Sequence, residues 1–265
     1  MVIDIKRGPL ASTLVLHGFQ KNSIDLKGWF NYIERWFQKG GVIPIKMDIT
    51  GKNCVKGRST IKFENGKKRL EQNNFQEITG IWIAALPPKV KIEMFDFIFA
   101  AHLDCTSPRD TLVLCWDDQI IRFERGYLET LAKDLYTYLQ PAYGYGYQRE
   151  FRQGPTFYPF GVLSGIDAFS EEAKQITQWS IEYGRSDGNY RIGMFRDIYP
   201  INFLSKPHLD QKIGNQTLQC WIESSPQHGE LHTLINNKLW SWWIPEDNIA
   251  TVREELKPMG LLICV

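Results

Sequence analysis

The segment QPAYGYGYQREFRQGP, Gln140 to Pro155, has the most unusual spacing in the chain. Tyrosines at positions 143, 145 and 147 alternate with glycines at positions 144 and 146. Alternate residues of a strand point to opposite faces, so three phenols would line one face and leave the other without side chains. The bare face lets another backbone or a helix approach closely. We therefore expect a well-anchored strand at this place.

Hydrophobic periodicity predicts strands and helices in alternation along the rest of the chain. Helices are expected over residues 23–41, 123–141, 170–184 and 245–260. Strands are expected over residues 12–19, 42–50, 79–86, 93–103, 110–116, 189–200 and 261–265, with a hairpin over 231–244. This order predicts an α+β fold, with a mostly antiparallel sheet and helices packed on one face.

The segments that begin at Thr111 and Leu239 both run strand, helix, proline, glycine and strand, which suggests a duplicated strand-helix-strand unit. We expect one α+β domain over residues 1–265. An alternative division separates a basic part, residues 1–110, from residues 111–265.

The composition is typical of a soluble globular protein, with 43% apolar and 23% charged residues. No apolar run is long enough to span a bilayer, and the first residues contain no secretory signal pattern. The five cysteines are isolated and form no CxxC pair. We therefore expect a cytoplasmic protein with free thiols and no membrane association.

Basic residues are concentrated at the start of the chain. Residues 1–70 contain 14 Lys and Arg against five Asp and Glu, although the whole chain has a net charge of only +1. The excess peaks between Gly51 and Leu70, where it could attract an anionic partner or form an ordinary solvated loop or hairpin. The candidate anion-binding residues are Lys52, Lys56, Arg58, Lys67, Lys68 and Arg69.

Catalytic fingerprints are missing from the sequence. It contains no phosphate-binding GxxxxGK[ST], no GxGxxG after a strand, no GxSxG and no HExxH. His228 and His232 are four residues apart, but Pro226 and Gly229 favour a turn there, and no third metal ligand is apparent. The segment HLDC, His102 to Cys105, would place the imidazole and the thiol on opposite faces of a strand. We predict no enzyme activity, no metal and no cofactor.

The tyrosine segment and the residues after it combine Tyr, Arg and Phe, which are typical of interface hot spots. The same composition suits a packed strand with a structured loop, or a surface that stacks single-stranded nucleic acid. We expect Tyr143 to be buried, Tyr145 mostly buried and Tyr147 on an accessible rim. The candidate partner-binding residues are Tyr145, Tyr147, Arg149, Arg152, Phe157 and Tyr158.

Three segments together resemble the immunity proteins of bacterial toxin systems, especially the type VI secretion immunity family. They are IIRFERGYLETLAKDLYTYLQPAYGYGYQ, FRDIYPINFLSKPHLDQKIGN and WIPEDNIATVREELKPMG, and they lie between about residues 120 and 262. The matching positions are Tyr127, Leu131, Leu135, Pro141, Gly144, Gly146, Asn202, Phe203, Leu204, Leu209, Gly214, Leu256 and Pro258. The basic first third of the chain has no counterpart in that pattern.

The resemblance implies a non-enzymatic protein that binds and neutralises a cognate toxin, and this is our leading hypothesis. An alternative is a nucleic-acid-associated protein of a defence or regulatory system that uses the basic N-terminal segment. A third hypothesis is a hydrolase that uses His102, His208 or His228.

Overall fold

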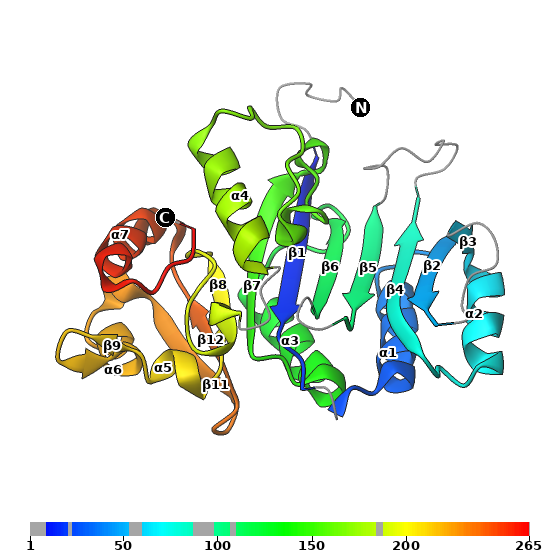
Figure 1. Ribbon diagram of the computed structural model, residues 1–265, viewed down its shortest axis with the longest axis horizontal. Helices are drawn as coiled ribbons and strands as arrows, with labels where there is room; N and C mark the ends of the chain where they lie inside the picture. Colours follow the sequence, from blue (N-terminus) through cyan, green and yellow to red (C-terminus); the bar gives the residue numbers. More distant parts are fainter. Residues whose placement is uncertain are drawn as a thin grey trace.

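Strand β1 (Leu10–His17) lies inside a large antiparallel sheet, between β7 (Tyr143–Glu150) and β6 (Thr111–Asp117) (Figure 1). The structure is a computed structural model, and it describes residues 9–20, 23–52, 60–86, 98–106, 110–183 and 188–264. In these ranges the sheet has ten strands in the order β11-β12-β8-β7-β1-β6-β5-β4-β2-β3. Strands from the beginning and the end of the chain therefore share one sheet.

The remaining elements complete this sheet and cover it. The other strands of the sheet are β2 (Lys46–Gly51), β3 (Thr60–Lys62), β4 (Ile78–Ala85), β5 (Phe99–Asp104), β8 (Ile201–Leu204), β11 (Glu230–Ile235) and β12 (Leu239–Trp243). A separate small pair joins β9 (Lys212–Ile213) and β10 (Gln216–Thr217). The helices are α1 (Leu26–Lys39), α2 (Phe63–Gln72), α3 (Arg125–Leu139), α4 (Glu171–Tyr183), α5 (Lys206–Leu209), α6 (Leu218–Glu223) and α7 (Glu246–Leu256).

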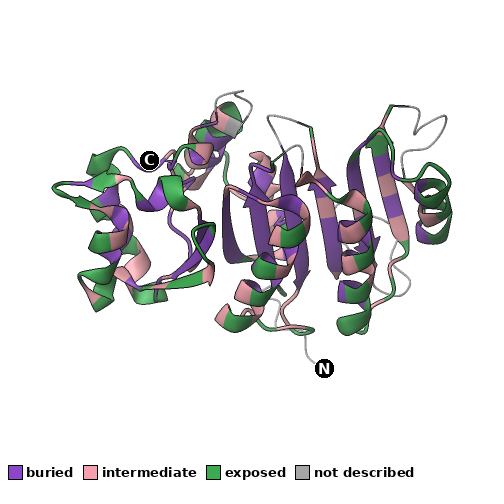
Figure 2. Ribbon diagram, turned by 90° about the horizontal axis from the view of Figure 1, so that it is seen from below, coloured by how far each residue is buried: buried purple, intermediate pink, exposed green. Residues whose placement is uncertain are grey.

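Side chains of β1 and β6 alternate between two hydrophobic cores. Leu14 and Leu16 face a core that includes side chains of α1, α2 and α3. Val15, between them, faces a second core that includes α4, α6 and α7. Figure 2 shows the strands largely buried, with α1 and α3 on the opposite side of the sheet from α4. The expected α+β fold is confirmed, and helices cover both faces of the sheet rather than one.

Strand β7 matches the expectation from its sequence. Its glycine face points to the first core, where a Cβ at Gly146 would lie 3.5 Å from Leu128 Cδ1 of α3 and 2.7 Å from Ile201 Cγ2. Its three tyrosines belong to the second core. The absence of side chains thus allows α3 and the neighbouring strand to approach β7 closely.

Three local expectations were wrong. Helix α2 forms where a loop or hairpin was expected; Gly66 interrupts its sequence and no side chain caps its N-terminus, so the usual helix signals are weak. Residues 189–200 form a 3₁₀ turn and irregular chain instead of a strand. Leu262 forms an isolated parallel bridge to Phe195 rather than a terminal strand, so the two proposed strand-helix-strand units end differently.

Replacement of Gly144 by alanine should destabilise the fold. The added Cβ would lie 2.6 Å from both the Val15 carbonyl oxygen and Leu16 Cδ2, and the backbone atom has no freedom to move away. We expect a loss of about 1–3 kcal/mol in the free energy of unfolding, measured by urea denaturation. Gly126→Ala is the matched control, because a Cβ there meets no atom within 4 Å. Equal stability of the two variants would contradict this packing.

Candidate protein-binding site

The tyrosines of β7 surround a buried arginine. Arg196 is 1% exposed, and its Nη1 donates a hydrogen bond to Tyr145 Oη at 2.8 Å. Its guanidinium carbon lies 3.8 Å from the ring centroid of Tyr158 and 5.0 Å from that of Trp179 on α4. Among the described residues, its Nε and Nη2 have no hydrogen-bond partner. The cation is therefore stabilised mainly by aromatic faces and one phenol.

His17 of β1 also contacts Tyr145. Its Nδ1 is 2.9 Å from Thr111 Oγ1, and its Nε2 is 3.4 Å from Tyr145 Oη. Burial lowers the pKa of His17 well below its usual value, and the positive charges of Arg196 and Arg191 lower it further. A neutral imidazole at this position avoids a second buried positive charge next to Arg196.

The expected accessible position of Tyr147 was wrong. Tyr143, Tyr145 and Tyr147 are 1%, 0% and 5% exposed, so all three are buried. The Tyr147 hydroxyl donates a hydrogen bond to the carbonyl oxygen of Pro155, in the chain that folds back after Gly154. Gly154 has a φ of 60°, which permits this reversal. The Gly-Pro pair at positions 154–155 is a sequence signal for such a turn, but the polar residues before it suggested an exposed strand end.

The other four candidate residues lie at the edge of this cluster and differ in accessibility. The Arg149 side chain is 11% exposed, pairs with Glu172 of α4, and lies 4.3 Å from the Tyr158 ring centroid. Phe157 and Tyr158 are half-buried. The Arg152 side chain is 69% exposed and contacts Glu150. A surface ion pair of this kind is weak, so Arg152 stays available to a partner.

An exposed apolar loop adjoins Arg152. We use the name apolar loop for residues 161–170, which connect the 3₁₀ turn Tyr158–Phe160 to α4. Within the loop, the backbone of Gly165 packs against that of Arg152. Val162, Leu163 and Phe169 are 41%, 42% and 90% exposed. Exposed apolar side chains next to an arginine have the composition of a protein-binding surface.

The backbone of the apolar loop is held in place. Asp167 Oδ1 accepts a hydrogen bond from the Phe169 N–H at 3.0 Å, and the Asp167 carbonyl accepts one from Ser170 Oγ at 2.7 Å. Ser170 Oγ in turn accepts the Ala173 N–H at 3.2 Å at the start of α4. Phe169 is thus presented to solvent by an ordered turn. Sequence reasoning missed this surface, although apolar residues between Gly161 and Gly165 were a visible signal.

Four of the six candidate anion-binding residues lie in the described part of the chain. Lys52 follows β2, and Lys68 and Arg69 are exposed on α2. Lys67 is half-buried, and its Nζ lies 2.7 Å from Glu34 Oε1 of α1, which raises the pKa of the lysine. Lys56 and Arg58 lie outside the described residues. The observed positions bring Lys67, Lys68 and Arg69 together on one short helix.

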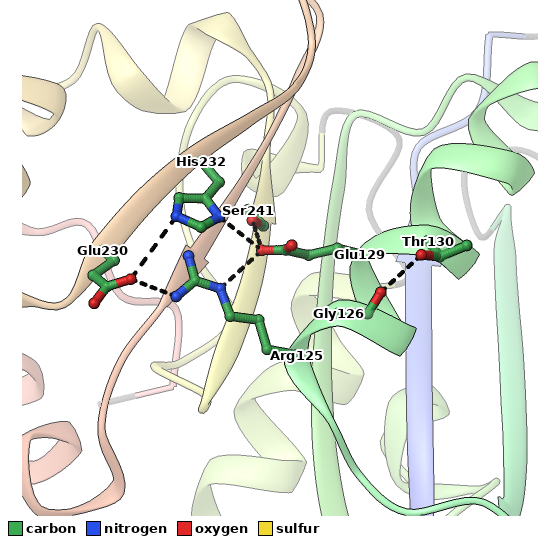
Figure 3. A network of polar contacts seen from close by, with 7 residues as sticks. All are labelled: Arg125, Gly126, Glu129, Thr130, Glu230, His232 and Ser241. Atoms are coloured by element: carbon green, nitrogen blue, oxygen red, sulfur yellow. Dashed lines mark hydrogen bonds and ion pairs between the residues drawn. The ribbon is translucent and has the colours of Figure 1, made fainter.

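A second polar network joins α3 to the hairpin β11–β12 (Figure 3). Glu129 Oε1 accepts hydrogen bonds from Arg125 Nε at 2.9 Å and from Ser241 Oγ at 2.6 Å, and lies 3.4 Å from His232 Nδ1. Arg125 Nη1 also contacts Glu230 Oε2 at 2.5 Å. The hydroxyl of buried Ser241 donates to the carboxylate and not to the imidazole, so the group lacks the arrangement of an activated serine. Its evident role is to fix the hairpin against the helix.

The histidines considered for hydrolysis lie in different elements and pack against different rings. His102 is next to Phe160, His208 next to Tyr143, and His228 is stacked on Trp221. Burial raises the pKa of the Cys105 thiol to about 12, which disfavours the thiolate. The described part of the chain contains no group of three or more His, Cys, Asp or Glu residues that could hold a metal ion. Cys105, Cys115, Cys220 and Cys264 are free thiols, and Cys54 lies outside the described residues.

Comparison with known proteins identifies no family. No family model matches the chain, and no curated protein matches it. Among solved structures, the chain is similar to a T6SS protein of Pseudomonas aeruginosa, at 11% sequence identity and a TM-score of 0.49. The match covers 96% of this chain and 73% of that chain. A similarity of this size does not assign a function. None of the described helices is long and apolar enough to cross a membrane.

Tyr145→Phe should destabilise the fold even though it removes a single oxygen atom. The change deletes the acceptor of the 2.8 Å bond from Arg196 Nη1 and leaves a buried cation with one partner fewer. We expect a loss of about 1–3 kcal/mol in the free energy of unfolding, measured by denaturant titration. Tyr136→Phe on α3 is the control, since Tyr136 is half-buried. A Tyr145→Phe variant as stable as the control would show that the phenol does not hold Arg196.

Acid should destabilise the fold through His208. Burial lowers the pKa of His208 to about 4, and an unfolded histidine has a pKa of about 6.5. Between these values the unfolded chain binds the proton and the folded chain does not, so stability falls as pH decreases through this window. The loss in unfolding free energy between pH 7 and pH 4.5 should be about 2 kcal/mol smaller for His208→Gln than for the wild type. Equal losses would mean that His208 does not resist protonation.

Proposed function

We propose that this chain is a non-enzymatic, cytoplasmic immunity-type protein that binds and neutralises a cognate toxin through the apolar loop and the neighbouring Arg152. The observation that carries the proposal is the 90% exposure of Phe169 on an ordered turn. A large aromatic ring held in water by a defined backbone is costly unless a partner covers it. The resemblance of residues 120–262 to immunity proteins supplies the class of partner.

The surface has the parts of an interface hot spot. Phe169 provides a rigid anchor, Val162 and Leu163 provide apolar area, and Arg152 provides a charged group on the rim. The buried tyrosine cluster beneath supports this surface through Trp179 of α4, whose Nε1 donates to the Pro159 carbonyl at 2.6 Å. A preformed surface binds with little loss of conformational entropy.

Binding should depend on Phe169 and Arg152. Any secreted toxin encoded beside the gene for this chain is co-expressed with it, and cell growth and co-purification are measured. For a toxin that is neutralised, Phe169→Ala should weaken binding by about 2 kcal/mol, or roughly 30-fold in Kd, in a calorimetric titration. Arg152→Ala should weaken binding by about 1 kcal/mol or more. The matched control is Ile43→Ala, because Ile43 is 79% exposed and lies between α1 and β2.

Two different outcomes would contradict the proposal. If a toxin binds but neither Phe169→Ala nor Arg152→Ala changes its Kd relative to Ile43→Ala, the apolar loop is not the binding surface. If no neighbouring toxin is bound or neutralised, the immunity function itself is wrong. Unchanged melting temperatures of the variants would separate a loss of contact from a loss of fold.

A further inference from the structure

A groove lies between α1 and α3. These two helices lie on the face of the sheet away from α4 (Figure 2). Its volume is about 790 Å³, which is within the range of roughly 300–1,000 Å³ for ligand sites. It contains three tyrosines, a tryptophan and both signs of charge. The residues that line it are Tyr32, Arg35, Trp36, Gln38, Lys39, Tyr127, Thr130, Leu131, Asp134, Thr137 and Tyr138.

Hydrogen bonds between the helices fix the groove in shape. The Tyr32 hydroxyl donates to Asp134 Oδ2 at 3.1 Å, and Trp36 Nε1 donates to the Tyr127 hydroxyl at 2.8 Å. Trp36 is only 2% exposed, and the Tyr32 and Tyr138 ring centroids are 5.8 Å apart. The walls are therefore aligned before any ligand arrives, which lowers the entropic cost of binding.

The lining of the groove has more positively than negatively charged side chains. Arg35 and Lys39 are exposed on α1, and within the described ranges neither forms an ion pair. Asp134 is the one carboxylate of the lining and already accepts the Tyr32 hydroxyl. A ligand with a negative group near Arg35 and Lys39 and an N–H donor near Asp134 would complement both sides.

We propose that this groove binds an extended peptide segment that carries an acidic side chain. Backbone amides of a peptide can donate to Asp134, while an acidic side chain pairs with Arg35 or Lys39. A nucleic acid fits less well, because Asp134 would repel its phosphates and the buried Trp36 ring is not free to stack on a base. The inference does not depend on the toxin-binding proposal, since the groove and the apolar loop are lined by different residues.

The length of the segment follows from the helix. Tyr127 and Tyr138 mark the two ends of the lining on α3, and eleven residues of helix rise about 16 Å. An extended chain covers this distance in about five residues at roughly 3.3 Å each. The site therefore fits a short linear segment better than a folded domain surface.

A phage-displayed library of random octapeptides tests the site. The library is selected on the full chain and counter-selected on Arg35→Glu. We expect the enriched clones to carry Asp or Glu beside apolar residues. A synthetic peptide from such a clone should bind at least about tenfold more weakly to Arg35→Glu and to Lys39→Glu than to the wild type, by fluorescence polarisation.

The control variants distinguish binding in the groove from a general effect of charge and from binding at the apolar loop. Lys27→Glu makes the same charge reversal at an exposed position of α1 outside the lining, and it should keep wild-type affinity. Phe169→Ala should also keep it, so failure here is distinct from failure of the toxin-binding proposal. The proposal is wrong if no clone is enriched, if the enriched clones are basic, or if their peptides bind Arg35→Glu as tightly as the wild type. If an octathymidine oligonucleotide binds more tightly than the peptides and this binding is lost in Arg35→Glu, the ligand of the groove is a nucleic acid and not a peptide.

Discussion

Strand β7 packs on both faces because glycine and tyrosine alternate along it. On the glycine face, a Cβ at Gly146 would lie 2.7 Å from Ile201 Cγ2 of β8, which is too close, and 3.5 Å from Leu128 Cδ1 of α3, which leaves no room for a side chain larger than alanine. The tyrosine face fills the space under α4 with three large rings. An alternation of apolar residues of equal size would have kept α3 away from the sheet or left the second core underfilled. The thickness of both layers therefore depends on this one strand.

The buried guanidinium of Arg196 connects this strand to the outer surface. A buried charge costs free energy unless it is paired, and here one phenol and the faces of Tyr158 and Trp179 provide the compensation. Tyr158 and Trp179 belong to the 3₁₀ turn and the helix that border the apolar loop. Interactions in the second core thus hold the two elements between which the apolar loop lies. An aromatic environment also requires each phenol to keep a proton, and burial raises the pKa of Tyr145 accordingly.

Features that depend on neighbouring residues could be predicted from the sequence. Features that depend on contacts between distant segments could not. The Asp25 cap of α1 and the positive φ of Asn237 in the hairpin turn are local features, because a cap or a turn depends on neighbouring residues. The burial of Tyr147 was not readable, because residues after Gly154 return to cover its hydroxyl. The role of Arg196 depends on three segments that are far apart in the chain. One wall of the groove can be read from the sequence, because Tyr32, Arg35 and Lys39 recur at helical spacing. The second wall cannot, because it depends on the antiparallel placement of α3 against α1.

The sheet separates the two surfaces that this structure offers to partners. The groove rests on the first core and the apolar loop on the second, and helices α1 and α3 lie on the opposite side of the sheet from α4 (Figure 2). No described residue lines both. Substitutions at sites that share no partner usually have additive free energies, so the two surfaces should act independently unless the sheet itself deforms. A deformation of that kind would have to change the packing of β7, whose glycine face has no free space and whose tyrosine face holds a buried cation. The same strand that brings the two layers together therefore also isolates their outer surfaces from each other.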